Sequence, residues 1–279
     1  MTFSIAARDG DAWGVAVASK FLAVGSVVPA VRVGVGAVAT QSLARVAYLD
    51  EILDALAVGT DVTAALRDAV AADEGRALRQ VGAVGPTGAA TFTGDGCFAW
   101  AGGVAAGDEH SAYAIQGNIL TGPEVTGAME TAWLGSAGQR LDHRLIATIL
   151  AGDDSGGDSR GRQGAAILAH APGAGYDRCG VLADLRVDDH PDAPRELARL
   201  HDLSTLFFGG PEDVRPLVGA LRDEVAAQLK ALGHSGTDVE AALDTWLSEV
   251  NLENRRSPGG VDRRVLEELR AAASPLTGP

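Results

Sequence analysis

The chain is poor in cysteine, in aromatic residues and in long hydrophobic runs. Its 279 residues include only two cysteines, Cys97 and Cys179, which form no closely spaced pair. We therefore expect reduced thiols rather than a zinc site or a disulfide framework. No apolar stretch approaches the roughly 18 residues of a membrane-spanning helix, and residues 1–14 lack the basic segment and apolar core of a signal peptide. These absences predict a cytoplasmic protein.

Basic residues are scarce as well. There are 23 Lys and Arg residues against 37 Asp and Glu residues, which gives a formal net charge of −14. Binding to nucleic acid or to an anionic membrane needs a basic surface, so we expect neither partner. The sequence has no GxxxxGKS/T phosphate loop and no GxGxxG motif after a strand, so we expect no nucleotide or other cofactor. The expected partner is a small-molecule substrate.

One run of acidic and histidine residues raises the question of a metal site. Asp188, Asp189 and His190 are consecutive, and their side chains are metal-binding groups. Successive residues leaving a strand point in different directions, so at most two of them can share an ion, and Pro191 indicates a turn. The sequence favours a structural aspartate–Arg186 pair or a capping role, and we predict no metal.

The hydrophobic pattern predicts an α+β fold. Alternating residues indicate strands, and helical spacing indicates helices. Strands are predicted over 2–6, 13–19, 31–40, 80–84, 89–93, 111–116, 163–170 and 181–187, and helices over 43–58, 62–72, 123–134, 139–150 and 194–207. Because strands and helices do not alternate one by one, this order fits antiparallel sheets with helices on their outer faces.

A break at Gly209-Gly210-Pro211 predicts two domains. The larger spans residues 1–209. The smaller spans residues 211–279, with three helices predicted over 213–232, 238–248 and 261–272.

Thr2 is the most informative residue for function. Methionine aminopeptidase removes an initial methionine when the next side chain is small, so we expect loss of Met1 and a free α-amine on Thr2. An unperturbed α-amine has a pKa of about 7.7–8.0, so a useful fraction is neutral and can accept the proton of the hydroxyl. A hydroxyl nucleophile and its own base on one residue is a known catalytic arrangement, and here that residue leads directly into a strand.

Several separated segments resemble an uncharacterised bacterial family that is assigned to the Ntn-hydrolase-like superfamily. They are MTFSIAARD, WGVAVASKFLAVGSVVP, GVGAVATQ, QGNILTGPEV, GGDSRGRQGAA and DLRVDDHP. The resemblance covers roughly residues 1–209. It implies a four-layer αββα sandwich with the nucleophile at the start of a central strand, and it implies no particular substrate.

The tail resembles the small three-helix peptidoglycan-binding-like module that often follows this family. The resemblance rests on helix spacing and on the segments AALDTW, NLE and VLEELR. Without an export signal we expect a structural or oligomerisation role for this domain, and hence a homo-oligomer.

Two further residues are candidates for catalysis. Lys20 follows the second predicted strand, where a positive charge near the Thr2 amine would lower the pKa of that amine; a solvated strand-end lysine is the alternative. Asn118 ends a strand and offers an amide donor for an oxyanion, although an Asx turn would explain it equally well.

The candidates for substrate binding lie at strand ends and in a glycine-rich loop. Ser26 and Gln41 flank the third predicted strand, and Gln116 precedes Asn118 by two residues. Asp158 and Arg162 lie in the loop DDSGGDSRGR, which can close over a ligand but is also typical of plain turns.

We therefore predict a hydrolase of a small amide or related C–N bond, acting through an acyl ester on Thr2. The alternative is a catalytically silent Ntn-like scaffold that binds a ligand or a partner.

Overall fold

The computed structural model describes residues 2–274, so Met1, whose removal the sequence predicts, lies outside the described residues. The chain divides into two compact units after His201. Helix α5 (Ala193–Phe208) runs across this division, which therefore falls earlier along the chain than the predicted break at Gly209-Gly210-Pro211. Among residues 2–274, no helix has the length and the apolar character to cross a membrane.

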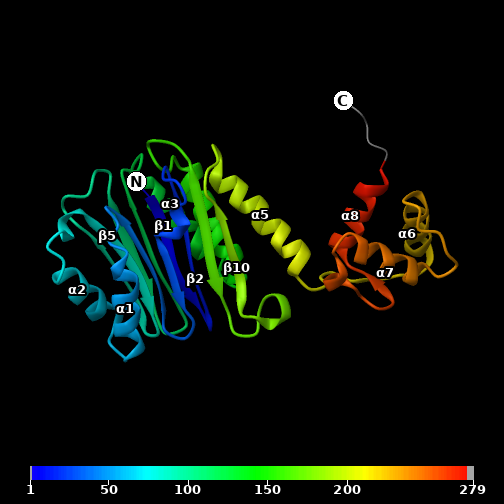
Figure 1. Ribbon diagram of the computed structural model, residues 1–279, viewed down its shortest axis with the longest axis horizontal. Coiled ribbons are helices and arrows are strands. Elements are labelled where there is room, and N and C mark those ends of the chain that lie inside the picture. The colour runs from blue at the N-terminus through cyan, green and yellow to red at the C-terminus, as the bar shows by residue number, and fades with distance from the viewer. Residues whose placement is uncertain (1, 275–279) are drawn as a thin grey trace. The chain divides into compact units, whose positions relative to one another are not determined.

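The first unit contains two antiparallel sheets (Figure 1). The larger has the strand order β10 (Val181–Val187), β9 (Gly164–His170), β2 (Ala12–Ser19), β1 (Thr2–Asp9), β8 (Ser111–Asn118) and β7 (Gly102–Gly107). The smaller has the order β3 (Pro29–Arg32), β4 (Gly36–Ser42), β5 (Arg79–Gly85) and β6 (Gly88–Thr93). The predicted α+β class with antiparallel sheets is therefore confirmed.

Four helices of this unit pack on the sheets. Helices α1 (Ala47–Ala57) and α2 (Val62–Ala71) share a hydrophobic cluster with β4 and β5, and Figure 1 shows them on the outer side of the smaller sheet. Helices α3 (Glu124–Gly135) and α4 (Leu141–Asp154) share another with β1, β2, β8 and β9. A third cluster, which includes Ala6, Val15, Ala39 and Val84, lies between the two sheets.

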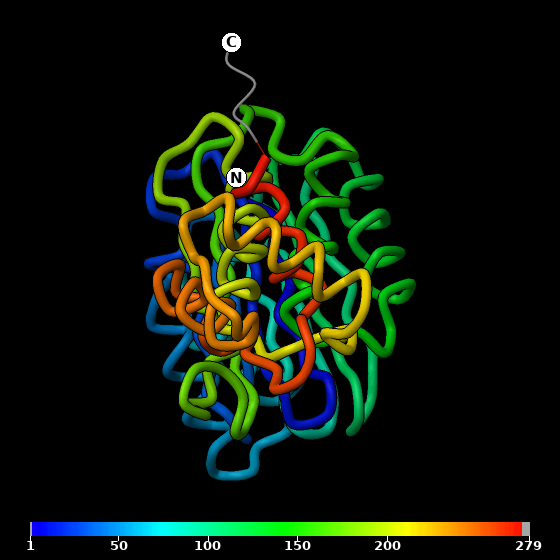
Figure 2. Tube along the Cα trace, turned by 90° about the vertical axis from the view of Figure 1, so that its right-hand side faces the viewer, coloured from blue at the N-terminus to red at the C-terminus, as the bar shows by residue number. Residues whose placement is uncertain are grey.

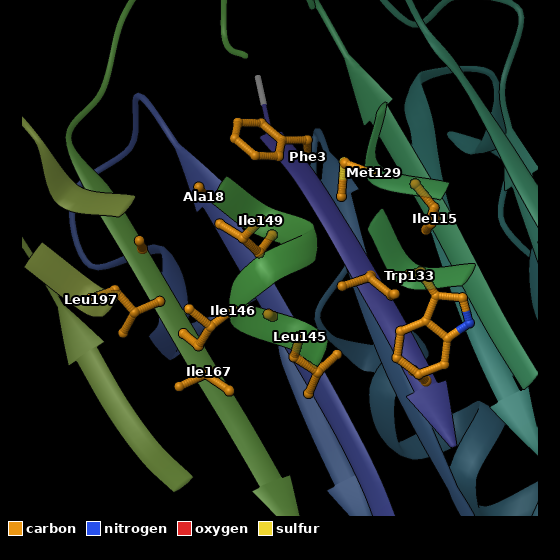
Figure 3. Packing of buried hydrophobic residues seen from close by; sticks show 14 of the residues in the cluster. Phe3, Ala18, Ile115, Met129, Trp133, Leu145, Ile146, Ile149, Ile167 and Leu197 are labelled. Carbon is orange, nitrogen blue, oxygen red and sulfur yellow. The ribbon is translucent and has the colours of Figure 1, made fainter. Parts of the chain in front are cut away.

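Strand β1 is buried on both faces. Its alternate residues Phe3 and Ile5 pack toward α3 and α4, against Met129, Trp133 and Ile149, as Figure 3 shows for Phe3. The residues between them face the other sheet, because successive side chains of a strand point to opposite faces. Thr2 and Ser4 are thus on the same side of the strand as Ala6.

The structure corrects three predicted elements. The strand predicted over 31–40 is a hairpin of β3 and β4, in which Gly34 has the left-handed φ of +74° that the turn requires. The helix predicted from residue 43 begins at Ala47. Strand β7 was not predicted, because its sequence GGVAAG has little of the β-branched and aromatic character typical of strands.

The second unit has a hydrophobic core of its own. It contains α6 (Gly219–Ala231), α7 (Val239–Glu249), α8 (Arg263–Ala273) and a short pair of strands, β11 (Arg215–Pro216) and β12 (Gly260–Val261). The helices can be traced in orange and red in Figure 2. Buried residues of this core are Leu206, Val225, Leu229, Leu243, Trp246, Leu266 and Leu269. The last turns of α5 therefore belong to the second core.

Arg255 ties the end of α5 into that core. The guanidinium is 2% exposed and donates hydrogen bonds to the carbonyl oxygens of Leu206 (2.7 Å) and Thr205 (2.6 Å). It also pairs with the buried carboxylate of Asp262 at 3.1 Å.

These contacts predict where the second unit can be separated. A fragment of residues 202–279 should be more stable than one of residues 211–279 by at least about 2 kcal/mol, because the shorter fragment loses Leu206 and two acceptors of a buried guanidinium. Urea denaturation of both fragments measures the difference. Equal unfolding midpoints would show that the end of α5 does not stabilise this core.

Candidate functional site

Thr2 lies at one end of the two central strands of the larger sheet. It pairs with Asn118 of β8, and the antiparallel register of β1 and β2 places it beside the end of β2. The Oγ1 atom of Thr2 is 3.1 Å from Oγ of Ser19, in a hydrogen bond that either hydroxyl can donate. Thr2 is 5% exposed, and Ser19 and Asn118 are almost fully buried. The hydroxyl is thus held inside the protein.

A set of buried polar side chains continues from Thr2 between the two sheets. This amide cluster consists of Ser4, Gln41, Gln80, Gln116 and Asn118, which come from β1, β4, β5 and β8. Gln41 Nε2 donates to the carbonyl oxygen of Thr2 (3.1 Å) and to Oε1 of Gln80 (2.7 Å). The cluster therefore connects the first residue of β1 to the opposite sheet.

The remaining hydrogen bonds close the amide cluster. Ser4 Oγ donates to Gln41 Oε1 at 2.7 Å and accepts from Gln116 Nε2 at 2.7 Å. Asn118 Nδ2 donates to Gln80 Oε1 at 2.9 Å, and Gln80 Nε2 donates to the carbonyl oxygen of Gly117 at 2.7 Å. Buried amides matched in this way avoid the cost of unpaired donors and acceptors.

The structure brings together some of the predicted site residues and separates another. Thr2, Gln41, Gln116 and Asn118 all meet in or beside the amide cluster. Ser26 is exposed, and its hydroxyl donates to the carbonyl oxygen of Ala23 (2.7 Å) within a short 3-10 turn, so it does not join the cluster. We therefore assign Ser26 to the turn.

Sequence reasoning missed Gln80. The alternating pattern of β5 could have revealed this residue. Val84 faces the other sheet, and Gly82 and Gln80 are two and four residues before it, so they face the same way. A polar residue on an otherwise apolar inward face needs a buried partner.

Two of the other predicted residues, Asp158 and Arg162, line a pocket together with Ser19. Its volume is about 130 Å³, and its lining includes Phe3, Ser19, Asp153, Asp158 and Arg162. Ser19, which hydrogen-bonds to Thr2, is among the lining residues, whereas Thr2, on the side of β1 that faces the other sheet, is not.

A chain of contacts holds the wall of this pocket. The backbone N–H of Lys20 donates to Asp158 Oδ2 (2.7 Å), and Lys20 Nζ donates to the carbonyl oxygen of Arg162 (3.2 Å). Arg162 Nε donates to Asp153 Oδ1 at 2.6 Å. This hydrogen bond raises the pKa of the Arg162 guanidinium, which stays charged. Asp153 was not predicted as a site residue; it opens the sequence segment DDSGGDSRGR, and the structure places it in the last turn of α4.

The acidic and histidine run has separate partners for each residue. Asp188 pairs with Arg186 (2.9 Å), Asp189 accepts from Gln163 (3.1 Å), and Nδ1 of His190 accepts from a backbone N–H (3.1 Å). The predicted pairing of an aspartate with Arg186 is confirmed.

Another group, Asp142, His143 and His201, has its potential ligand atoms within 4.8 Å of one another. Asp142 already accepts two hydrogen bonds of 2.6 Å from Arg140 and one of 2.7 Å from His201. Burial favours the neutral carboxyl, but these hydrogen bonds outweigh it and hold the pKa of Asp142 below its usual value. We assign this group to the packing of α4 and α5.

Comparison with known proteins shows relatives of both parts of the chain. A family model described as a family of unknown function, DUF1028, matches residues 2–197. A model of a peptidoglycan-binding-like domain matches residues 206–269. A crystal structure of a DUF1028 protein from Silicibacter pomeroyi is similar, with 29% identity and a TM-score of 0.64, over 80% of this chain and 89% of that one. No curated protein matches the chain.

The amide cluster predicts that Gly82 cannot carry a side chain. A Cβ atom there would lie 2.0 Å from Oε1 of Gln116. We expect Gly82→Ala to displace Gln116 and to lower the free energy of unfolding by roughly 1–3 kcal/mol, as measured by chemical denaturation.

The control is Gly88→Ala in the next strand, where a Cβ would meet no atom within 4 Å. Equal stability of the two variants would contradict a tightly packed amide cluster.

Proposed function

Because the chain belongs to the DUF1028 family, whose function is unknown, we propose its activity from the site: hydrolysis of a small amide or related C–N bond, with Thr2 as nucleophile. The observation that carries the proposal is the position of the Thr2 hydroxyl. It lies at the first residue of a central strand, 3.1 Å from Ser19 Oγ. Ser19 is also among the residues that line a pocket with two carboxylates and a guanidinium.

The arrangement of the layers supports the same proposal. The two sheets face each other across a hydrophobic cluster, and each packs against a pair of helices on its other face. We propose that this is the four-layer αββα sandwich of Ntn-hydrolase-like proteins, in which the nucleophile starts a central strand.

The reaction requires cleavage of the bond that precedes Thr2, which frees its α-amine. Thr2 Oγ1 then attacks the carbonyl carbon of the substrate, the amine accepts the hydroxyl proton, and the π electrons move to the carbonyl oxygen. Collapse of the tetrahedral intermediate breaks the C–N bond, and the leaving nitrogen takes the proton from the α-ammonium. The product of this half-reaction is an ester on Thr2.

Water completes the cycle. It attacks the ester carbonyl while the α-amine accepts one of its protons, and Thr2 Oγ1 leaves with that proton, which releases a carboxylic acid. In both half-reactions, Asn118 Nδ2 and nearby backbone N–H groups donate hydrogen bonds to the oxyanion of the tetrahedral intermediate. Ser19 positions the Thr2 hydroxyl through the hydrogen bond between them.

The alternative is a silent scaffold, and the burial of Thr2 favours it. At 5% exposure, the hydroxyl is almost inaccessible to a substrate. Intact-mass measurement separates the two functions, because retention of Met1 leaves no amine on Thr2 and supports the scaffold.

Labelling with an electrophilic β-lactone tests the nucleophile. We expect one label per chain, on Thr2, lost in Thr2→Ala and kept in Thr2→Ser. The labelling rate should rise with pH as the amine loses its proton, with a midpoint below the unperturbed pKa of about 7.7–8.0, because burial disfavours the charged amine. Peptide mapping identifies the site. A label elsewhere, or none once release of Met1 is established, would exclude this mechanism.

Lys20→Met tests the role of the lysine charge. The side chain is exposed, so we expect the unfolding free energy to change by only about 0–1 kcal/mol. If the positive charge lowers the pKa of the Thr2 amine, labelling falls at neutral pH and partly recovers at higher pH. A loss of labelling that is the same at every pH would mean that Lys20 positions the substrate instead.

A further inference from the structure

Strand β10 lies at one edge of the larger sheet and pairs on its inner side with β9. Among residues 2–274, the backbone groups of residues 182–187 have no hydrogen bond other than those to β9. In an edge strand, alternate N–H and C=O groups point away from the sheet and can pair with a strand of another chain. Strand β10 therefore offers an open edge.

The two faces of β10 differ in character. Ala183 and Val187 are buried in the hydrophobic cluster under α3 and α4, and Leu185 is partly buried against it. Asp184 and Arg186 are exposed and lie on the opposite face, because successive side chains of a strand alternate. Asp184 has no hydrogen bond or ion pair with any of the described residues.

The sequence of this edge, VLADLRV, is complementary to itself. When a second β10 lies antiparallel to the first, about a two-fold axis through Leu185, Asp184 is opposite Arg186 of the partner subunit. By symmetry the same ion pair forms a second time. Opposed residues of an antiparallel pair have Cβ atoms about 4.5–5.5 Å apart, and opposite charges there are stabilising. On the other face, Ala183 is opposite Val187 of the partner subunit, so the apolar row continues.

The charges also disfavour the neighbouring registers. An axis through Asp184 opposes two carboxylates, and an axis through Arg186 opposes two guanidinium groups; like charges in opposed positions are destabilising. A shift by one residue sets the charged face of one strand against the apolar face of the other. Of the registers centred on residues 184, 185 and 186, only the one about Leu185 pairs opposite charges.

We propose that the protein forms a two-fold symmetric homodimer in which β10 pairs antiparallel with β10 of a second copy, in register about Leu185. A two-fold contact needs a self-complementary surface, and β10 has one on both faces. Arg186 also pairs with Asp188 at 2.9 Å, and the five N–H donors of a guanidinium allow it to contact both carboxylates. The homo-oligomer expected from the sequence thus forms through the first unit, independently of the proposed hydrolysis.

Charge reversal tests the dimer. Sedimentation velocity of the full-length protein at up to about 0.1 mM should show a dimer. Asp184→Arg and Arg186→Asp each replace two attractive pairs by two repulsive ones, so each should raise the Kd of the dimer at least about tenfold. The variant that carries both substitutions restores two opposite-charge pairs and should dimerise like the unchanged protein.

The matched control lies on α2, which packs on the smaller sheet. Asp68 is exposed there and pairs with Arg67. Asp68→Arg makes the same charge change as Asp184→Arg, away from β10, and should leave the Kd unchanged. Circular dichroism establishes that each variant is folded.

A monomer at every concentration would overturn the proposal and would show that the charges of β10 protect the edge from pairing. A dimer that survives Asp184→Arg, or one that the double substitution does not restore, would place the contact elsewhere. The unchanged protein and Asp184→Arg decide the matter even if Arg186→Asp does not fold, because Asp184 is exposed and has no partner to lose among the described residues.

Discussion

The hydrogen bonds of Gln41 are the interaction on which the site depends. One amide N–H group reaches both the carbonyl oxygen of Thr2 in the larger sheet and the side chain of Gln80 in the smaller one. The apolar cluster between the sheets fixes their separation but not the position of a single polar atom. At this end, directional hydrogen bonds define where β1 starts. Each partner is buried, so displacement of any one leaves others unpaired at a cost of about 1–3 kcal/mol.

The amide cluster and the pocket contribute in different ways. The cluster is neutral, and its hydrogen bonds satisfy one another, so it can hold Thr2 rigidly without placing a charge beside it. The pocket holds the charges, with Asp153 and Asp158 buried in its wall. Ser19 is the link, because it contacts Thr2 and also lines the pocket.

Local sequence patterns predicted the residues that lie at strand ends, and missed those that depend on contacts between elements. Thr2 and Asn118 could be predicted because each ends a strand with a clear alternating pattern. Gln80 could not, since its role follows from pairing with Gln41 of another strand, β4. Asp153 lies in the same segment as Arg162, but the pattern of that segment does not show which of its carboxylates is buried against the guanidinium. Ser26 was misassigned because its place near a strand end suggested a site, whereas its hydroxyl closes a turn.

The neutral surroundings of Thr2 also bear on its chemistry. Its side chain hydrogen-bonds to the hydroxyl of Ser19 and its carbonyl oxygen accepts from the amide of Gln41, neither of which is charged. An amine released at this buried position would be desolvated, and desolvation lowers the pKa of an amine. A carboxylate in place of Gln41 would have the opposite effect, because it would stabilise the ammonium form and remove the base. Neutral amides are therefore the side chains that can fix a Thr2 nucleophile in place and still leave its amine able to accept a proton near neutral pH.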